Sequence, residues 1–175
     1  MKETQAGMTR PSIASSAAAL VGIVPFIGGL MLIYQLIGIQ APYFGFLFLL
    51  YWMSMLHQQA AQYFPSLIGG LGGIGLAWFL LTIPAMHGTA GLALGLALLA
   101  SVLLLFIRQQ ARLIVNNATM LFLTVATIPQ IDVTNNALDF VASLLFGALY
   151  CGALVMLMKW MGNRRKLPAS PEPTA

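Results

Sequence analysis

Charged residues are scarce in this sequence, and their scarcity decides the class of protein. Of its 175 residues only 7% are charged, whereas 59% are hydrophobic, and the mean hydropathy is +0.88. A soluble domain carries about 25% charged residues. Because a chain of this length could not hide so much apolar surface from water, the composition predicts an integral membrane protein built as one compact bundle.

Cysteine and the usual catalytic motifs are also nearly absent. The single cysteine, Cys151, excludes an internal disulfide and a cysteine-rich metal site, and its apolar flanks predict a small packing residue. His57 and His87 have no Cys, Asp or Glu at ligand spacing, so we expect no metal site and no cofactor. No nucleophile motif such as G-x-S-x-G occurs. We therefore expect no enzymatic activity and assign no catalytic residue.

Long apolar runs make up most of what is present, and they predict an all-α fold of six transmembrane helices. A spanning helix needs about 20 apolar residues. The candidate runs cover residues 12–37, 42–57, 66–83, 89–107, 113–128 and 137–161. We therefore expect a six-helix membrane domain over residues 12–162. A polar tail over residues 1–11 precedes it, and a basic and then disordered tail over residues 163–175 follows it.

The positions of the basic residues predict the orientation of these spans. Six spans with a cytoplasmic N-terminus place the loops at 38–41, 84–89 and 129–136 outside, and none of these loops contains Lys or Arg. All eight basic residues then lie inside: Lys2, Arg10, Arg108, Arg112, Lys159, Arg164, Arg165 and Lys166. This positive-inside pattern predicts that both termini are cytoplasmic. Because the basic residues are few and flank apolar spans, the net charge of +4 does not indicate a nucleic-acid partner.

Glycine is abundant in two of the predicted spans, where it allows helices to approach closely. Gly69 and Gly73 form a G-x-x-x-G pair in the third span, and Gly91 and Gly95 form another in the fourth. Small residues of this kind let membrane helices pack backbone to backbone. We expect tight packing among spans three, four and six. A pore or substrate groove flanked by these glycines is the alternative.

The most polar stretch between two apolar runs is residues 108–120, RQQARLIVNNATM. Asn116 and Asn117 lie about one helical turn into the membrane, and Asn117, Thr124 and Thr127 lie roughly along one stripe of the fifth helix. One interpretation is that the stripe hydrogen-bonds to neighbouring helices and holds the bundle together. The other is that it lines a substrate path, with Arg112 attracting an anion at the cytoplasmic mouth.

The two acidic residues outside the tails, Asp132 and Asp139, precede or open the sixth span. Asp139 follows Asn136 by three residues, a spacing that predicts an Asn N-cap with an acidic residue in the first turn. None of the six runs has a carboxylate at mid-depth, which argues against a proton-driven pump.

The order of these spans resembles the membrane part of the fusaric-acid-resistance and aromatic-acid-exporter families, and of small bacterial inner-membrane proteins with a related layout. The similarity covers about residues 12–162 and rests on pattern. The quoted segments are SSAAALVG, APYFGFLFLLYW, IGGLGGIGLAW, MLFLTVATIP and ALDFVASLLFGALYCGALV. The resemblance implies export of small organic anions from an assembly of several subunits. The cytoplasmic domain and second membrane half of those exporters have no counterpart in this sequence.

The sequence therefore predicts a multi-pass protein of a bacterial cytoplasmic membrane that acts as a homo-oligomer or with a partner membrane subunit. The first hypothesis is a transporter or channel component for a small organic solute, with Arg112, Asn116, Asn117, Thr124 and Thr127 along the substrate path. The second hypothesis is a scaffold or accessory subunit that transports nothing. In that case the same polar residues serve assembly or stability.

Overall fold

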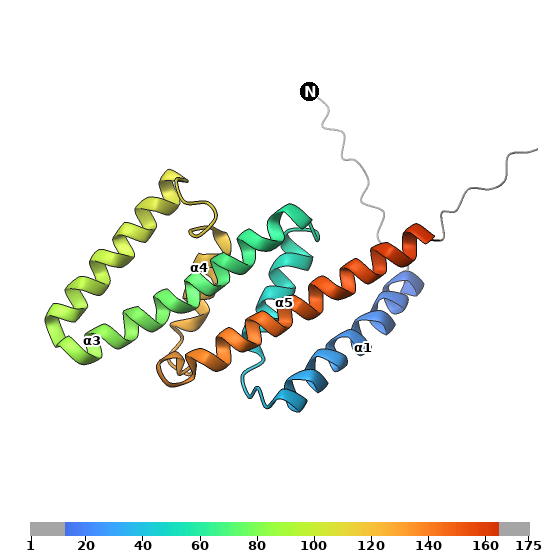
Figure 1. The fold of residues 1–175 in the computed structure, drawn as a ribbon, viewed down its shortest axis with the longest axis horizontal. Coiled ribbons are helices and arrows are strands. Elements are labelled where there is room, and N and C mark those ends of the chain that lie inside the picture. Colours follow the sequence, from blue (N-terminus) through green and yellow to red (C-terminus); the bar gives the residue numbers. More distant parts are fainter. Residues whose placement is uncertain (1–12, 165–175) are drawn as a thin grey trace, which may run out of the picture. The chain divides into compact units, whose positions relative to one another are not determined.

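The computed structural model describes residues 13–164, with side-chain surroundings for residues 24–161. This part of the chain is helical and contains no β-strand, which confirms the predicted all-α class. The elements are α1 (Ile13–Ile37), α2 (Tyr43–Leu49), the π-helix η1 (Leu50–Met55), α3 (Ala60–Arg108), α4 (Asn117–Ala126) and α5 (Val133–Arg164) (Figure 1). The predicted tail over residues 1–11 and residues 165–175 of the second tail lie outside the described residues.

The chain divides into two compact units, one ending at Gly38 and one beginning at Ile39. The first contains α1, which ends where Gly38 adopts a φ of +83° and donates its N–H to the carbonyl of Tyr34. Glycine tolerates this left-handed conformation and commonly ends helices. The second unit contains all the other elements and carries the candidate site.

Two stretches of the second unit are long and apolar enough to cross a membrane by length and composition: Ala60–Arg108 and Val133–Met161. Tyr43–Met55 and Asn117–Ala126 are apolar but shorter. At 1.5 Å per residue, α4 is about 15 Å long, roughly half of the hydrocarbon core. The apolar run over residues 113–128 thus forms a shorter helix than the expected span.

Helix α3 is a hairpin of two limbs (Figure 1). The expectation that the first limb stops at Pro84 is wrong, because the helix continues through Pro84 and breaks at Gly88, where φ is 57° and ψ is −131°. A proline inside a helix removes one hydrogen bond, whereas this backbone conformation is readily available only to glycine. Gly91 then lies directly on the backbone of Ile83 and Pro84, so a side chain there would hold the two limbs apart.

Aromatic rings fill the place where α2, α4 and α5 meet. Phe44 of α2 is fully buried. Its ring centroid lies 5.9 Å from that of Phe122 on α4 and 4.8 Å from that of Phe140 on α5. Successive segments of this unit run in alternating directions, from α2 through the two limbs of α3 to α4 and α5 (Figure 1). The loops therefore gather at two opposite ends.

Candidate functional site

Asn116 is the centre of the polar stretch that the sequence singled out. The Asn116 side-chain oxygen accepts a hydrogen bond from the backbone N–H of Thr119 at 3.2 Å. The backbone N–H of Asn116 donates in turn to the Thr119 hydroxyl at 3.1 Å. This reciprocal capping box begins α4 by satisfying N–H groups that have no partner inside the helix. Residues 113–116 therefore stay non-helical. This explains why α4, which forms from the fifth predicted span, is shorter than that span.

Asn116 also joins α4 to α3. Its amide nitrogen donates to the carbonyl oxygen of Pro65 at 2.7 Å and lies 3.2 Å from the carbonyl oxygen of Arg112. The side chain rests directly on Gly69, where a Cβ atom would collide with it. Asn116 is thus fully bonded to protein, as expected for a residue that holds the bundle together, although it also lines the pocket described next.

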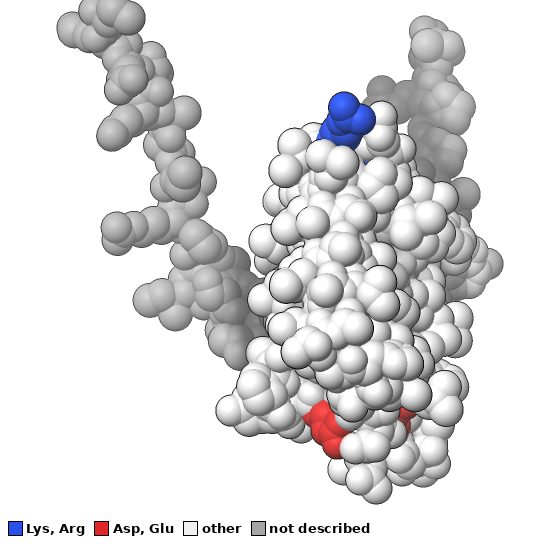
Figure 2. Space-filling model, turned by 90° about the vertical axis from the view of Figure 1, so that its left-hand side faces the viewer, with Lys and Arg blue, Asp and Glu red and all other residues white. Residues whose placement is uncertain are grey.

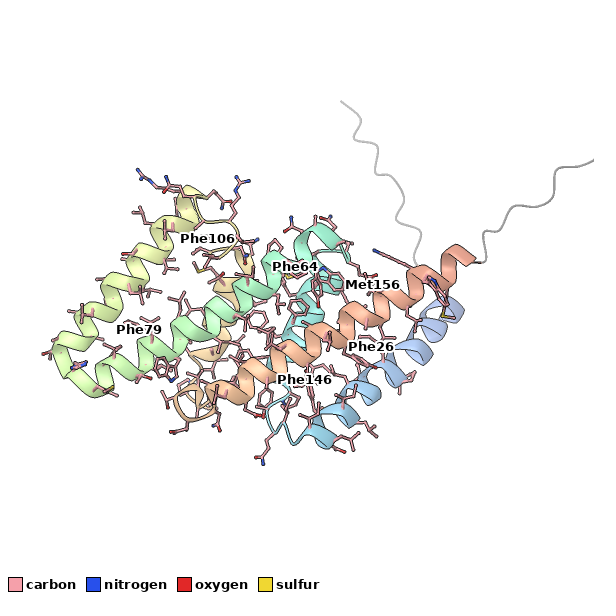
Figure 3. The ribbon with its side chains drawn as sticks, viewed as in Figure 1. Phe26, Phe64, Phe79, Phe106, Phe146 and Met156 are labelled. Carbon is pink, nitrogen blue, oxygen red and sulfur yellow. The ribbon has the colours of Figure 1, made fainter. Side chains whose placement is uncertain are left out.

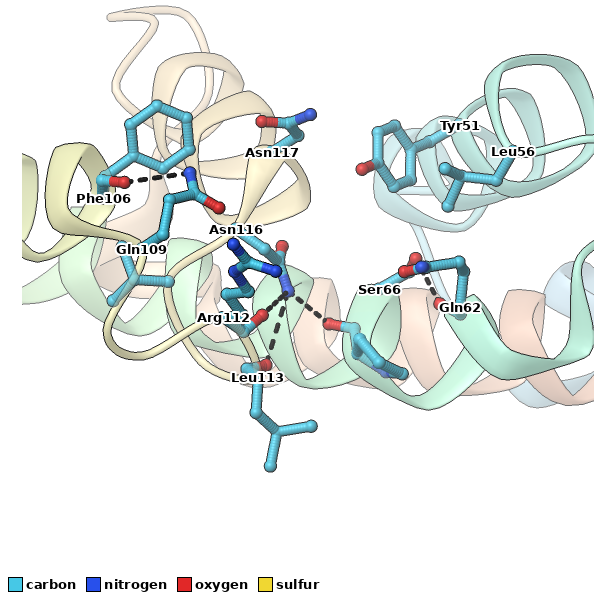
Figure 4. A pocket seen from close by; sticks show the side chains of 12 residues that line it. Tyr51, Leu56, Gln62, Ser66, Phe106, Gln109, Arg112, Leu113, Asn116 and Asn117 are labelled. Carbon is cyan, nitrogen blue, oxygen red and sulfur yellow. Dashed lines mark hydrogen bonds between the residues drawn. The ribbon is translucent and has the colours of Figure 1, made fainter.

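A pocket of about 490 Å³ opens beside this junction (Figure 4). The lining residues come from η1 and the following turn, the start of the first limb and the end of the second limb of α3, the segment that joins α3 to α4, and the first residue of α4. They are Tyr51, Leu56, Gln62, Pro65, Ser66, Phe106, Gln109, Arg112, Leu113, Val115, Asn116 and Asn117. Asn117 and the Tyr51 hydroxyl point into the pocket from opposite sides (Figure 4).

The pocket carries an uncompensated positive charge. Arg112 is exposed, and its guanidinium forms no hydrogen bond or ion pair with any residue that the structure describes. The amide of Asn117 likewise has no partner among residues 24–161. Because both groups are hydrogen-bond donors that line the same pocket, the arrangement suits a small molecule with an anionic group.

Thr124 and Thr127 do not belong to this pocket, although they were grouped with it from their spacing. The Thr124 hydroxyl donates to the carbonyl of Met120 at 2.8 Å, and the Thr127 hydroxyl donates to the carbonyl of Thr124 at 3.0 Å. Both hydroxyls are therefore satisfied within their own segment. Arg112, Asn116 and Asn117 are the three predicted site residues that the fold brings together.

Beneath the pocket, α3 and α4 lie in backbone contact. A Cβ atom on Gly73 would be 2.6 Å from the Thr119 carbonyl oxygen and 2.8 Å from the Leu123 nitrogen. Gly69 and Gly73 thus pack against α4, which lies in the fifth predicted span. Gly91 of the fourth span packs on the third, and Gly70 of the third span faces Leu144 of the sixth, as expected. Gly95 faces Leu80 across the α3 hairpin. No passage for a solute runs between α3 and α4 at Gly73.

The acidic residues lie at the other end of the unit, and the expected capping pair is wrong. Helix α5 begins at Val133, and Asp132 caps it by accepting the Asn135 N–H at 3.3 Å. Hydrogen bonds from the Thr134 hydroxyl first, and then from Asn135, hold the pKa of Asp132 below its usual value. Asp139 instead accepts the backbone N–H of Ala41 at 3.0 Å, and the Asn136 amide donates to the Asp132 carbonyl at 3.1 Å, at a point where the helical backbone is interrupted (φ −116°, ψ 19°).

Figure 2 shows Lys and Arg at one end of the molecule and Asp and Glu at the opposite end. The pocket lies at the basic end, where α3 ends at Arg108 and the chain turns toward α4. Gln109 ends α3 in the left-handed conformation, with a φ of 55°. His57 and His87 are both exposed, and no group of three or more His, Cys, Asp or Glu that could hold a metal occurs in the described part of the chain.

Sequence reasoning missed four polar residues of the pocket: Tyr51, Gln62, Ser66 and Gln109. Of these, only Gln109 belongs to the polar stretch 108–120 that the sequence singled out. The spacing of two others in the sequence could have indicated a polar site, since Gln62 and Ser66 are four residues apart at the start of α3 and share a helix face. Comparison of the chain with models of known families, with curated proteins and with solved structures finds no match.

Proposed function

We propose that this chain is a multi-pass protein of a bacterial cytoplasmic membrane that helps to move a small organic anion, with the pocket as its cytoplasmic binding site. The observation that carries the proposal is the unpaired guanidinium of Arg112 beside the Asn117 amide in a pocket of about 490 Å³. The resemblance to aromatic-acid exporters implies the same class of solute. An aromatic carboxylate offers an anionic group to Arg112 and a ring to Tyr51 or Phe106.

The proposal includes six membrane-crossing segments with both termini in the cytoplasm. The alternating direction of the segments in the second unit supports it (Figure 1). The separation of charge supports the orientation, because basic residues favour the cytoplasmic side (Figure 2). In this arrangement the turn at Gly88 and the loop before α5 face outward, and the segment 109–116 faces the cytoplasm.

The irregular backbone beside the pocket also supports a water-filled site. Residues 109–116 join α3 to α4 without forming a helix, and five of them line the pocket together with Asn117. Non-helical backbone at membrane depth is tolerated where it lines an aqueous cavity or is buried in protein. A hydrated pocket open to the cytoplasm provides such an environment for this segment.

A scaffold or accessory subunit is the second candidate, and the contact at Gly73 favours it. Because α4 lies on the backbone of α3, a solute in the pocket cannot continue between these two helices. Transport by this chain therefore needs a route elsewhere, which a second copy or a partner subunit can complete. A scaffold requires no path at all.

Uptake of labelled benzoate into proteoliposomes separates the two candidates. We expect Arg112→Gln to lower the initial rate by about tenfold or more, since a hydrogen bond to a charged group contributes about 1.5–3 kcal/mol. Asn117→Leu should abolish uptake without lowering expression. Arg108→Gln, which removes a cation at the same end but outside the pocket, is the matched control and should stay within about twofold. Wild-type uptake no faster than in empty liposomes would contradict anion transport and favour the scaffold.

The orientation has its own test. Gln109 and Gln130 are both exposed and lie in loops at opposite ends of the unit. Each is replaced by cysteine in a Cys151→Ala background and treated in intact cells with a membrane-impermeant maleimide. We expect labelling at position 130 in intact cells, and at position 109 only after the membrane is permeabilised. The reverse pattern would overturn the proposed orientation.

A further inference from the structure

A second, largely apolar pocket of about 420 Å³ lies between α5, the start of α3 and η1, and it takes no part in the site described above. We call it the trough. Its lining residues are Trp52, Ala60, Tyr63, Phe64, Leu149, Gly152, Ala153, Val155, Met156 and Lys159. Phe64 and Met156 extend from the two long helices that flank it (Figure 3).

The floor of the trough is one face of α5 that ends in a lysine. Leu149, Gly152, Met156 and Lys159 follow one another at spacings of three and four residues, so they share a helix face. From Leu149 to Lys159 this face is about 15 Å long at 1.5 Å per residue. One leaflet contributes about the same depth to a hydrocarbon core roughly 30 Å thick.

The polar atoms along the walls are already bonded to protein. The Trp52 indole N–H donates to the carbonyl of Gln59 at 3.0 Å, and the Tyr63 hydroxyl donates to the carbonyl of Ala148 at 2.8 Å. Gly152 lets Tyr63 lie close to α5, because a Cβ there would be 3.0 Å from the Tyr63 hydroxyl. The trough therefore presents hydrocarbon and aromatic surface along its length and offers no free donor in its walls.

Lys159 is the exception, and it lies at the basic end of the unit. Its side chain is exposed and forms no ion pair or hydrogen bond with any described residue. A ligand that fits needs an apolar chain about one leaflet long and a negative charge at one end. A phospholipid of the cytoplasmic leaflet with an anionic headgroup has both features, since basic pockets between helices on that side recognise such headgroups.

We propose that the trough binds one acyl chain of an anionic phospholipid, with the lipid phosphate at the ammonium of Lys159. This inference requires the chain to lie in a bilayer but not to transport a solute. The lipid holds η1, α3 and α5 together at the cytoplasmic end. A small anion without an acyl chain would contact Lys159 but leave the apolar surface of the trough unfilled.

Native mass spectrometry of the full chain in detergent tests this, with phosphatidylglycerol and phosphatidylcholine of identical acyl chains as probes. We expect the wild type to retain one phosphatidylglycerol in preference to phosphatidylcholine. Lys159→Gln should lower the phosphatidylglycerol-bound fraction about fivefold, as expected for one basic residue near a membrane surface, and Lys159→Arg should restore it. Arg108→Gln is the charge control and should change nothing.

The acyl-chain part of the inference has a matched pair of variants on α5. Ala153 lines the trough and is exposed, whereas Leu157 is exposed on the same helix outside it. Ala153→Trp should remove the retained phosphatidylglycerol, and Leu157→Trp should not. Equal retention of both lipids, no effect of Lys159→Gln, or displacement of the lipid by benzoate would each overturn the inference. Benzoate uptake is scored separately, so loss of transport leaves this result standing.

Discussion

The two main contacts of the second unit are built in opposite ways. Between α3 and α4 the residues on the α3 side are glycines, the backbones touch at Gly73, and Asn116 reaches across to the Pro65 carbonyl. Between α2 and α5 the side chains are large, and Phe44 packs on Phe140 with ring centroids 4.8 Å apart. The first contact places α4 so that its N-terminal end borders the polar pocket, whereas the second provides the aromatic core.

The difference predicts which of the two contacts tolerates substitution. A contact made by backbone has no rotamers to adjust, so an added methyl group must move a whole helix. An aromatic contact between side chains can repack. The contact beside the candidate site is therefore the more rigid of the two, and the following substitutions test that contrast from the largest expected effect to the smallest.

Gly73→Ala should be the most damaging of these changes. Its new Cβ would meet the Thr119 oxygen at 2.6 Å, and we expect a loss of about 1–3 kcal/mol from overpacking. Gly75→Ala is the matched control on the same limb, because its Cβ meets nothing within 4 Å. It should be neutral or stabilising by up to about 1 kcal/mol, as alanine favours helix. Thermal unfolding in detergent measures both, and equal effects would refute the backbone contact.

Asn116→Ala removes the cap of α4 and its bond to α3 together. We expect a loss of about 2 kcal/mol, because an N-cap contributes about 0.5–2 kcal/mol and an interhelical hydrogen bond in a membrane about 0.6–2 kcal/mol. Asn117→Ala, at an exposed neighbour with no bonded side chain, should change stability by less than about 0.5 kcal/mol. The unfolding temperatures of the two variants report the difference. Similar values would mean that Asn116 does not hold α4 on α3.

Ser143→Ala tests the other contact through a polar link between α5 and α2. The Ser143 hydroxyl accepts the Gly45 N–H at 3.2 Å and is buried, so we expect a loss of about 1 kcal/mol. Ser101→Ala is the control, since that exposed hydroxyl donates only to its own helix at Ala97. In the same unfolding assay we expect Ser143→Ala to lower the stability by less than Asn116→Ala. The reverse order would show that the aromatic contact is the less tolerant one.

The smallest effect is a dependence on pH at the end opposite the pocket. The pKa of Asp132 is lowered in the folded protein by hydrogen bonds from Thr134 and Asn135. Its contribution to stability is therefore present above the ordinary carboxyl pKa of 3.8 and is lost as the pH falls through the lower folded value. Asp132→Asn should flatten the fall in unfolding temperature below about pH 4. An unchanged pH profile would contradict the capping role.

Part of this fold could be predicted from the sequence because its signals are local. Apolar runs, bounded by polar residues, proline or glycine, indicated helices. The glycine pairs in α3 indicated close packing. The N-cap of α5 was misplaced because Asn136 and Asp132 both carry capping groups, and spacing alone does not say where the helix starts. The turn was expected over residues 84–89, which contain Gly88, but the preceding helix was ended near Pro84 for the same reason, since both residues can interrupt a helix.

The sequence by itself determined the composition, the helical class and the placement of basic residues around the apolar runs, because these depend on residue type and order along the chain. Only the tertiary structure decided that Asn116 is bonded to Pro65 while Asn117 faces the pocket. The two asparagines have the same chemistry, but Asn116 is the N-cap with an extended backbone (φ −137°, ψ −176°) and Asn117 is the first helical residue, so their side chains leave the chain in different directions. Which of them meets another helix depends on the rotation of α4, and packing on Gly69 and Gly73 sets that rotation.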